Sequence, residues 1–152
     1  MAYLRRTLTA ATWALAIAGS SAWPLALATN SARAGVVVVV SADSGLEQLN
    51  AAQLADIYLG RLSHLPNGTP VEPIDQKERS PAHDEFYRKF LGQSPAQIKA
   101  HWSRLIFTGR GRPPRAVGDS AAAAEVIASD PNAIGYVDES LVDHRLRVLA
   151  IE

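Results

Sequence analysis

The sequence predicts a single α/β domain in which a mixed sheet is flanked by helices. The first observation is a run of five consecutive valines after Gly35, which is typical of a strand buried on both faces. The second is the order of the segments that follow. Capped helical patterns and short β-rich segments are expected in the order strand, helix, two strands, three helices, two strands. That order predicts one mixed α/β layer.

The first 34 residues are predicted to be a secretory signal peptide. Arg5 and Arg6 precede an apolar, Ala-rich stretch at 10–28, and a small-x-small cleavage site follows at 32–34, with 26–28 as a second candidate. Because glycine, serines and a proline interrupt the apolar stretch, a cleaved signal is favoured over a spanning helix. An uncleaved anchor is the alternative. We therefore expect an exported protein of a bacterial periplasm.

Cleavage at the first site would leave residues 35–152 as the folded domain. These 118 residues suffice for one core but not for two lobes. Removing the three arginines of the signal leaves 12 basic and 15 acidic residues, a formal charge of −3, so bulk charge does not indicate a nucleic-acid partner. The chain has no cysteine, which excludes disulfides, thiolate chemistry and a lipid-bearing cysteine.

The valine run at 36–40 is expected to be an interior strand, because it is β-branched and follows the cleavage motif. A continuation of the apolar stretch of the signal is the alternative. The strand leads into a small polar loop that contains Ser41, Asp43, Ser44 and Gly45. Ligands often bind at the carboxyl ends of strands in open α/β sheets. A simple turn is the other interpretation of this loop.

The next helix is expected to begin after Asn50, because Gln53 stands three residues on, as in a capping box. Gly60 ends this helix. A short strand at 61–65 and a second strand at 69–75 are predicted around an Asn-Gly turn.

The stretch at 76–92 is expected to organise the domain. A polar bend leads to Ser80 as the N-cap, Pro81 suits the first helical position, and Gly92 ends the helix. One face is apolar at helical spacing, and Glu85 and Lys89 form a favourable i,i+4 pair. Free amides and the helix dipole also make such a helix start a candidate anion site. A plain capped helix that binds only water is the alternative.

The C-terminal part is predicted to contain two more helices and two strands. One helix is capped by Ser94 and stops by Gly109, and the other begins at Asp119 or Ser120. The strands are expected at residues 133–137 and 145–151.

The two helices are separated by an irregular loop at 109–115 with three arginines, Arg110, Arg112 and Arg115. These side chains are either an anion site or solvated surface charge.

Motifs that carry catalysis or bind metals and cofactors are absent. The four histidines lack metal-ligand spacing, and there is no nucleophile elbow, Walker motif or dinucleotide glycine pattern. We therefore expect no enzyme activity, no cofactor and no bound metal.

Three blocks together resemble the phosphate-type periplasmic solute-binding proteins of ABC importers. Residues 54–61 read LADIYLGR and are similar to the family's IFLGK helix end. Residues 76–92 are similar to its Arg-x-Asp-x-Ser-Gly-Thr bend and helix. Residues 130–137 read DPNAIGYV, close to its TPGAIGYV strand. The resemblance implies a periplasmic-binding-protein-like fold of type II in a short, single-domain form.

The central block departs from the family pattern. Ser80 and Glu78 fall on the family's serine and aspartate, but Gln76 replaces its arginine and Pro81-Ala82 replaces its Gly-Thr. Gln76 cannot offer the charged, bidentate fork of arginine, and Pro81 has no N–H to donate. Tight phosphate binding therefore does not follow from the resemblance, and Gln76→Arg is expected to strengthen oxyanion binding if the pocket is open.

Two functions are compatible with this sequence. The first is an exported, non-catalytic protein that binds a small phosphate-like oxyanion weakly where the loop at 41–45 meets the helix start, with Gln76, Arg79, Ser80 and Arg110 as further candidate ligands. The second is a protein-interaction or sensory module that keeps the fold but has lost the ligand. The partner in either case is an ABC importer or another periplasmic or membrane protein.

Overall fold

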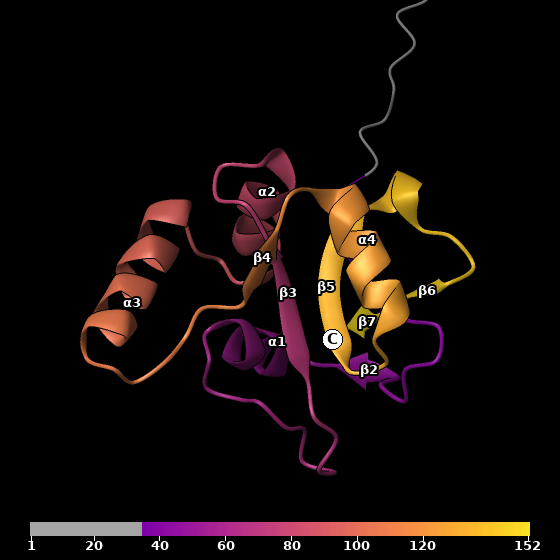
Figure 1. Ribbon diagram of the computed structural model, residues 1–152, viewed down its shortest axis with the longest axis horizontal. Helices are drawn as coiled ribbons and strands as arrows, with labels where there is room; N and C mark the ends of the chain where they lie inside the picture. Colours follow the sequence, from indigo (N-terminus) through magenta and orange to yellow (C-terminus); the bar gives the residue numbers. More distant parts are fainter. Residues whose placement is uncertain (1–34) are drawn as a thin grey trace, which may run out of the picture. The chain divides into compact units, whose positions relative to one another are not determined.

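The computed structural model describes residues 35–152, so the predicted signal peptide lies outside the described residues. None of the helices within this range is long and apolar enough to cross a membrane. The elements follow one another along the chain as shown in Figure 1. In order they are β1 (Val36–Ser41), β2 (Gln48–Leu49), α1 (Ala51–Tyr58), β3 (Glu72–Gln76), α2 (Pro81–Phe90), α3 (Pro95–Phe107), β4 (Arg115–Val117), α4 (Ser120–Ser129), β5 (Ala133–Asp138), the 3-10 turn η1 (Glu139–Leu141), β6 (Leu146–Val148) and β7 (Ala150–Ile151).

The main sheet has five strands in the order β4-β3-β5-β1-β6. Strand β3 runs parallel to both β4 and β5, whereas β1 runs antiparallel to β5 and to β6. Strands β2 and β7 form a separate parallel pair. The predicted mixed sheet is therefore confirmed, with β1 reversed relative to the parallel strands.

The valine strand β1 is an interior strand, as predicted. Val36, Val38 and Val40 face the larger core, and Val39 faces a smaller core on the other side of the sheet. All four are at most 1% exposed. Each buried valine contributes about 1.5–3 kcal/mol, so this run anchors both cores.

Helices cover both faces of the sheet. The larger core joins β1 to α1, α2 and the inner side of α3, and the smaller core joins β1, β3 and β5 to α4. Figure 1 shows α4 lying along β5. The α4 contact is close because Gly135 has no side chain: a Cβ there would overlap the Cδ1 atom of Ile127.

Aromatic side chains fill the centre of the larger core. Phe86 of α2 stacks on Tyr136 of β5, with ring centroids 4.0 Å apart and an interplanar angle of 6°. Tyr58 of α1 packs against Phe86 with a centroid distance of 4.6 Å. All three rings are fully buried. The stacking fixes the position of α2, and therefore of its N-terminus, relative to the sheet.

The structure corrects several predicted strands. Residues 61–65 form no strand, and only an isolated bridge joins His64 to Pro70. Residues 115–117, expected to belong to an irregular loop, form the edge strand β4. The segment at 145–151 is divided between β6 and β7, because Leu149 turns inward and donates its amide to Val38 O. Such short strands are defined by their partners rather than by their own pattern.

Candidate functional site

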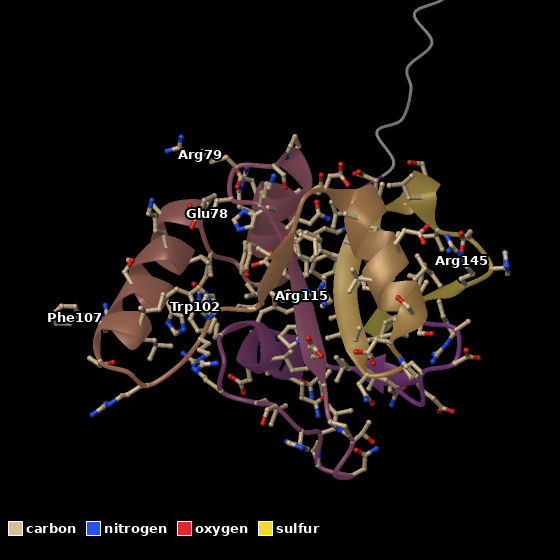
Figure 2. The ribbon with its side chains drawn as sticks, in the orientation of Figure 1. Glu78, Arg79, Trp102, Phe107, Arg115 and Arg145 are labelled. Atoms are coloured by element: carbon tan, nitrogen blue, oxygen red, sulfur yellow. The ribbon has the colours of Figure 1, made fainter. Side chains whose placement is uncertain are left out.

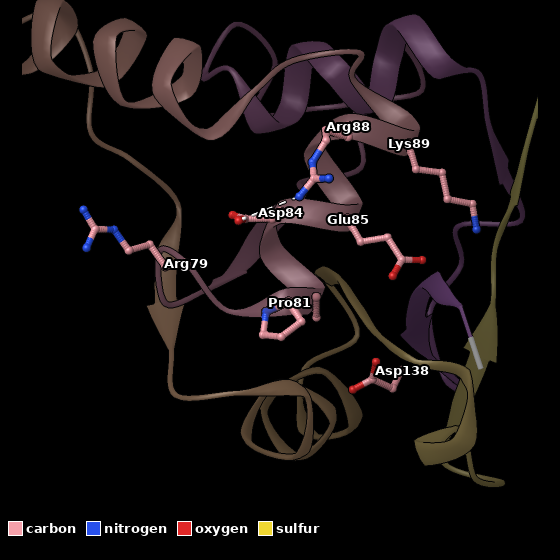
Figure 3. A pocket seen from close by; sticks show the side chains of 8 residues that line it. Arg79, Pro81, Asp84, Glu85, Arg88, Lys89 and Asp138 are labelled. Carbon is pink, nitrogen blue, oxygen red and sulfur yellow. Dashed lines mark ion pairs between the residues drawn. The ribbon is translucent and has the colours of Figure 1, made fainter. Parts of the chain in front are cut away.

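The start of α2 borders an open hollow of about 620 Å³, shown in Figure 3. Helix α2 begins as predicted, because Ser80 has extended backbone angles and its hydroxyl accepts the amide of His83 at 3.1 Å. The residues that line the hollow mix both charges and come from α2, the bend before it and the end of β5: Arg79, Pro81, Ala82, Asp84, Glu85, Arg88, Lys89 and Asp138.

Few backbone donors are free at this helix start. Pro81 has no N–H, the amide of His83 bonds to Ser80 Oγ, and the amide of Asp84 bonds to Ser80 O. Only the amide of Ala82 is left in the first turn for a ligand. The helix dipole still favours an anion there, but with one amide instead of several.

The charged side chains around the hollow are largely committed to the protein itself. Arg88 lies 3.9 Å from Asp84, as expected for an i,i+4 pair. The predicted pair of Glu85 with Lys89 does not form. Glu85 instead accepts the amide of Val36 at 3.0 Å, and Lys89 donates to Val36 O at 2.9 Å. Both side chains bond to the first residue of β1 on the edge of the strand that β6 does not reach, since β6 pairs only with residues 39–41.

Arg79 is the one cation of the hollow without an ion pair or side-chain hydrogen bond among the described residues. Its backbone has a φ of 70°, a left-handed conformation that is uncommon for a residue other than glycine. The side chain is exposed and extends away from the hollow (Figure 3). It is therefore free to turn toward an incoming anion.

Gln76, at the position of the family arginine, does not line the hollow at α2, and its side chain is engaged in bonds within the protein. It is 2% exposed, and its Nε2 donates to Tyr136 O at 2.9 Å and to Ser120 Oγ at 3.1 Å. Its side chain therefore joins β3 to β5 and α4. The structure contradicts the expectation that Gln76 belongs to the pocket at the start of α2. Gln76 stands two residues after Ile74, so its side chain lies on the same side of the strand, facing α4.

A buried polar cluster on the opposite side of β3 was not identified from the sequence. The carboxylate of Asp75 accepts hydrogen bonds from the Tyr87 hydroxyl at 2.7 Å, from the Tyr136 hydroxyl and from the backbone amide of Gln76. Burial, followed by the nearby Asp75 charge, raises the pKa of Tyr87 and of Tyr136 far above the usual range. The phenols therefore remain hydrogen-bond donors. The signal in the sequence was an aspartate next to Ile74 at the end of a buried strand.

The predicted loop of small polar residues does not meet the start of α2. Val40 pairs with Ile134, and Pro73, near the start of β3, pairs with the same residue. Ser41 therefore lies level with the beginning of β3, while Ser80 follows its carboxyl end. The expectation that these two segments form one pocket is wrong, because β1 runs antiparallel to β5.

The loop after β1 makes mainly internal contacts. Ser41 Oγ accepts the amide of Asp43 at 3.3 Å, and Ser44 Oγ accepts the amide of Leu46 at 3.3 Å. Arg147 donates to Ser44 O at 2.8 Å. Gly45 borders a separate shallow hollow beside β2. These bonds are those of a turn, which was the alternative interpretation of this loop.

Arg110 is also separate from the hollow. It is exposed just beyond the end of α3, where its amide bonds to Leu105 O. It does not line the hollow at α2. Of the eight predicted ligand residues, only Arg79 lines the hollow at α2, and Ser80 lies beside it as the helix cap. Gln76 and Arg79 both line another cavity, beside α3. Within residues 35–152, no group of three His, Asp or Glu side chains is arranged to hold a metal ion.

No protein-family model matches the sequence, and no curated protein matches it significantly. Solved structures do match the fold. A phosphate ABC transporter substrate-binding protein from Clostridium perfringens, with bound phosphate, has a TM-score of 0.59 and 17% identity over 77% of this chain and 44% of its own. PstS from Borrelia burgdorferi has a TM-score of 0.58 and 13% identity over 78% of this chain and 47% of its own.

An ABC-type phosphate transport receptor from Vibrio cholerae matches with a TM-score of 0.50 and 15% identity, over 77% of this chain and 46% of its own. The chain thus spans less than half the length of each of these proteins. At these identities the likeness concerns the fold. The chain has the fold of part of the phosphate ABC transporter substrate-binding proteins.

Proposed function

We propose that this chain is an exported, non-catalytic solute-binding protein that holds a small, phosphate-like oxyanion weakly at the start of α2. The observation that carries the proposal is the hollow in front of the Ser80 cap, where the free Ala82 amide and the unpaired Arg79 are neighbours along the chain. An N-terminal helix turn and a guanidinium are groups that bind oxyanions. The fold likeness to phosphate-binding proteins supports the same assignment.

Three features of the hollow make the proposed binding weak. Gln76 is buried in other contacts, so a charge-assisted bond of about 1.5–3 kcal/mol is missing. Pro81 removes one amide from the first turn. Asp84, Glu85 and Asp138 line the hollow and repel an anion. The affinity should be about ten- to a hundredfold below that of a full phosphate binder, at a factor of ten per 1.4 kcal/mol.

The proposed setting is the periplasm, reached through the predicted signal peptide at 1–34. The proteins of similar fold are named for phosphate ABC transport. We therefore propose an ABC importer, or another periplasmic or membrane protein, as the partner that receives the bound solute. We propose no nucleic-acid partner, because residues 35–152 carry a formal charge of −3.

Calorimetry with phosphate, arsenate and sulfate tests the proposed oxyanion site. Arg79→Ala should weaken phosphate binding about two- to fivefold, since an exposed charge contributes up to about 1 kcal/mol. Arg61→Ala is the matched control, because Arg61 is exposed, pairs with Asp56 and does not line the hollow. Absence of heat with all three anions, or an equal effect of both variants, would reject the site.

The second candidate function, a protein-interaction module, is favoured by the end of α3. Phe107 is 92% exposed and Ile106 is 56% exposed, and Figure 2 shows Phe107 projecting from the surface. A photocrosslinker at position 107 should then capture a partner in the periplasm, whereas one at Ala52, exposed on α1, should not. Equal capture from both positions would argue against a docking surface at Phe107.

A further inference from the structure

A second cavity of about 450 Å³ lies between α3 and the edge formed by β3 and β4. We call it the α3 groove. Its lining differs from that of the hollow at α2, and Arg79 is the one residue that borders both. Cavities of roughly 300–1,000 Å³ with apolar walls and a few polar groups are the usual sites for small molecules.

The walls of the α3 groove are apolar. Ile98, Trp102 and Ile106 of α3 face Pro113 and Pro114 of the segment before β4. Trp102 is 7% exposed, and its buried indole Nε1 has no hydrogen-bond partner among the described residues. Such walls suit an apolar or aromatic ligand body, and an indole ring also attracts cations.

The floor of the α3 groove carries a negative charge without a counter-charge. Asp75 lines the groove and accepts three hydrogen bonds, but no cationic group of the described residues pairs with it within 4.0 Å. His83, 3% exposed, also lines the groove, and its Nδ1 lies 3.0 Å from Asp84 Oδ1. When Nδ1–H donates to that carboxylate, Nε2 is an acceptor. Both groups therefore favour a ligand that donates hydrogen bonds.

Two cations, Lys99 and Arg79, line the α3 groove together with Glu78, but neither pairs with Asp75. Lys99 lies 3.9 Å from Glu78, so those two charges offset each other. Arg79 points into solvent, as Figure 2 shows. An oxyanion in the groove would lose its hydration next to the Asp75 carboxylate, which is costly.

We propose that the α3 groove binds small organic ammonium compounds whose apolar or aromatic body lies on Trp102 and Ile106. The ammonium group donates to Asp75 and His83. This site shares only Arg79 with the oxyanion site proposed at α2 and has the opposite charge preference, so each can fail without the other.

A matched series of probes tests the charge preference of the α3 groove. Benzylamine, benzyl alcohol and benzoate share one ring and differ in charge. Each probe is titrated into the protein while the NMR resonance of the Trp102 indole N–H is followed, and the Trp102→Phe variant assigns that resonance. Benzylamine should bind at least tenfold more tightly than either other probe. Phosphate, compared with sodium chloride at equal ionic strength, should not displace it. Equal binding of benzyl alcohol or benzoate, or no response to benzylamine, would overturn the proposal.

A pair of variants on one helix tests the location. Ser103 is exposed and lines the groove, whereas the adjacent Arg104 is exposed and does not. Ser103→Trp should fill the groove and weaken benzylamine binding at least tenfold, while Arg104→Trp leaves it unchanged. Undiminished binding to a folded Ser103→Trp protein would contradict the proposed site. If that variant does not fold, the probe series on the unaltered protein decides the question alone.

Discussion

Asp75 and Gln76 are adjacent in β3 but serve opposite sides of the sheet. Asp75 accepts hydrogen bonds from the hydroxyls of Tyr87 and Tyr136. The side-chain amide of Gln76 donates to Ser120 Oγ and to Tyr136 O. The resemblance to the phosphate-type family aligns Gln76 with the family's ligand arginine and so drew attention to this position. It did not indicate that the side chain points inward, because that depends on the side of the strand that α4 covers.

Alkaline pH should unfold the protein through its buried tyrosines. The pKa of Tyr58, Tyr87 and Tyr136 is raised chiefly by burial and then by Asp75. Since the folded pKa lies above the unfolded value near 10, their contribution to stability is complete below pH 10 and declines above it. The slope is about 1.4 kcal/mol per pH unit for each phenol.

Absorbance at 295 nm and circular dichroism, recorded together from pH 8 to 13, check this expectation. Tyrosinate from the three buried residues should appear only as the fold is lost. Reversible ionisation of these tyrosines in a folded protein would show that their hydroxyls reach solvent in the folded state.

Gln76→Arg should destabilise the fold instead of improving oxyanion binding. The guanidinium would break the contacts to Ser120 and Tyr136 O and place a buried charge between β3 and α4. The expected loss is about 3 kcal/mol in urea unfolding, because an uncompensated buried charge is costly. Lys77→Arg, at the exposed neighbour, should change stability by less than about 0.5 kcal/mol. A stable Gln76→Arg protein with tighter phosphate binding would reinstate the sequence-based expectation.

At the scale of elements, α2 holds the first strand as well as forming the candidate site. Glu85 Oε1 accepts the amide of Val36, the first residue of β1, and Lys89 Nζ donates to the carbonyl of the same residue. Each substitution, Glu85→Ala or Lys89→Ala, should cost about 0.5–1.5 kcal/mol of unfolding free energy. Lys99→Ala, which removes only an exposed contact at 3.9 Å, is the control. Equal costs for all three variants would show that the bonds to Val36 contribute nothing specific.

The end of α1 is shaped by its contact with α3. Gly60 has a φ of 71°, and a Cβ there would lie 2.7 Å from the Trp102 ring, whereas Gly68 has a φ of 84° with nothing within 4 Å. Gly60→Ala should therefore cost more than the roughly 1 kcal/mol of backbone strain expected for Gly68→Ala. Thermal unfolding of both variants measures the difference. Equal melting temperatures would mean that Trp102 moves aside freely.

Caps and apolar periodicity were sufficient to predict the four helices and the valine strand. Asn50, Ser80, Ser94 and Asp119 all cap their helices through a side-chain oxygen. The short strands were harder to predict, because three residues such as 115–117 acquire strand geometry only from pairing with β3. Cap signals are local, whereas strand pairing is a property of distant segments.

At the scale of the whole molecule, the direction of β1 decides which loops can share a ligand. A parallel β1 would have brought Ser41 to the same sheet edge as Ser80. The antiparallel pairing of β1 with β5 places the two at opposite edges instead. Five valines specify a buried strand but carry no information about its direction. The sequence therefore predicted the fold class and one of the two segments expected at the candidate site, the start of α2.

Mapping the phosphate response residue by residue tests this account most directly. In a ¹⁵N-edited NMR titration of the protein with phosphate, the amides of Arg79, Ser80 and Ala82 should shift together with one weak dissociation constant. The amides of Asp43 and Ser44, at the opposite edge, should not move beyond an ionic-strength control. Joint shifts of both segments, or shifts confined to the loop after β1, would contradict the placement of the site at the start of α2.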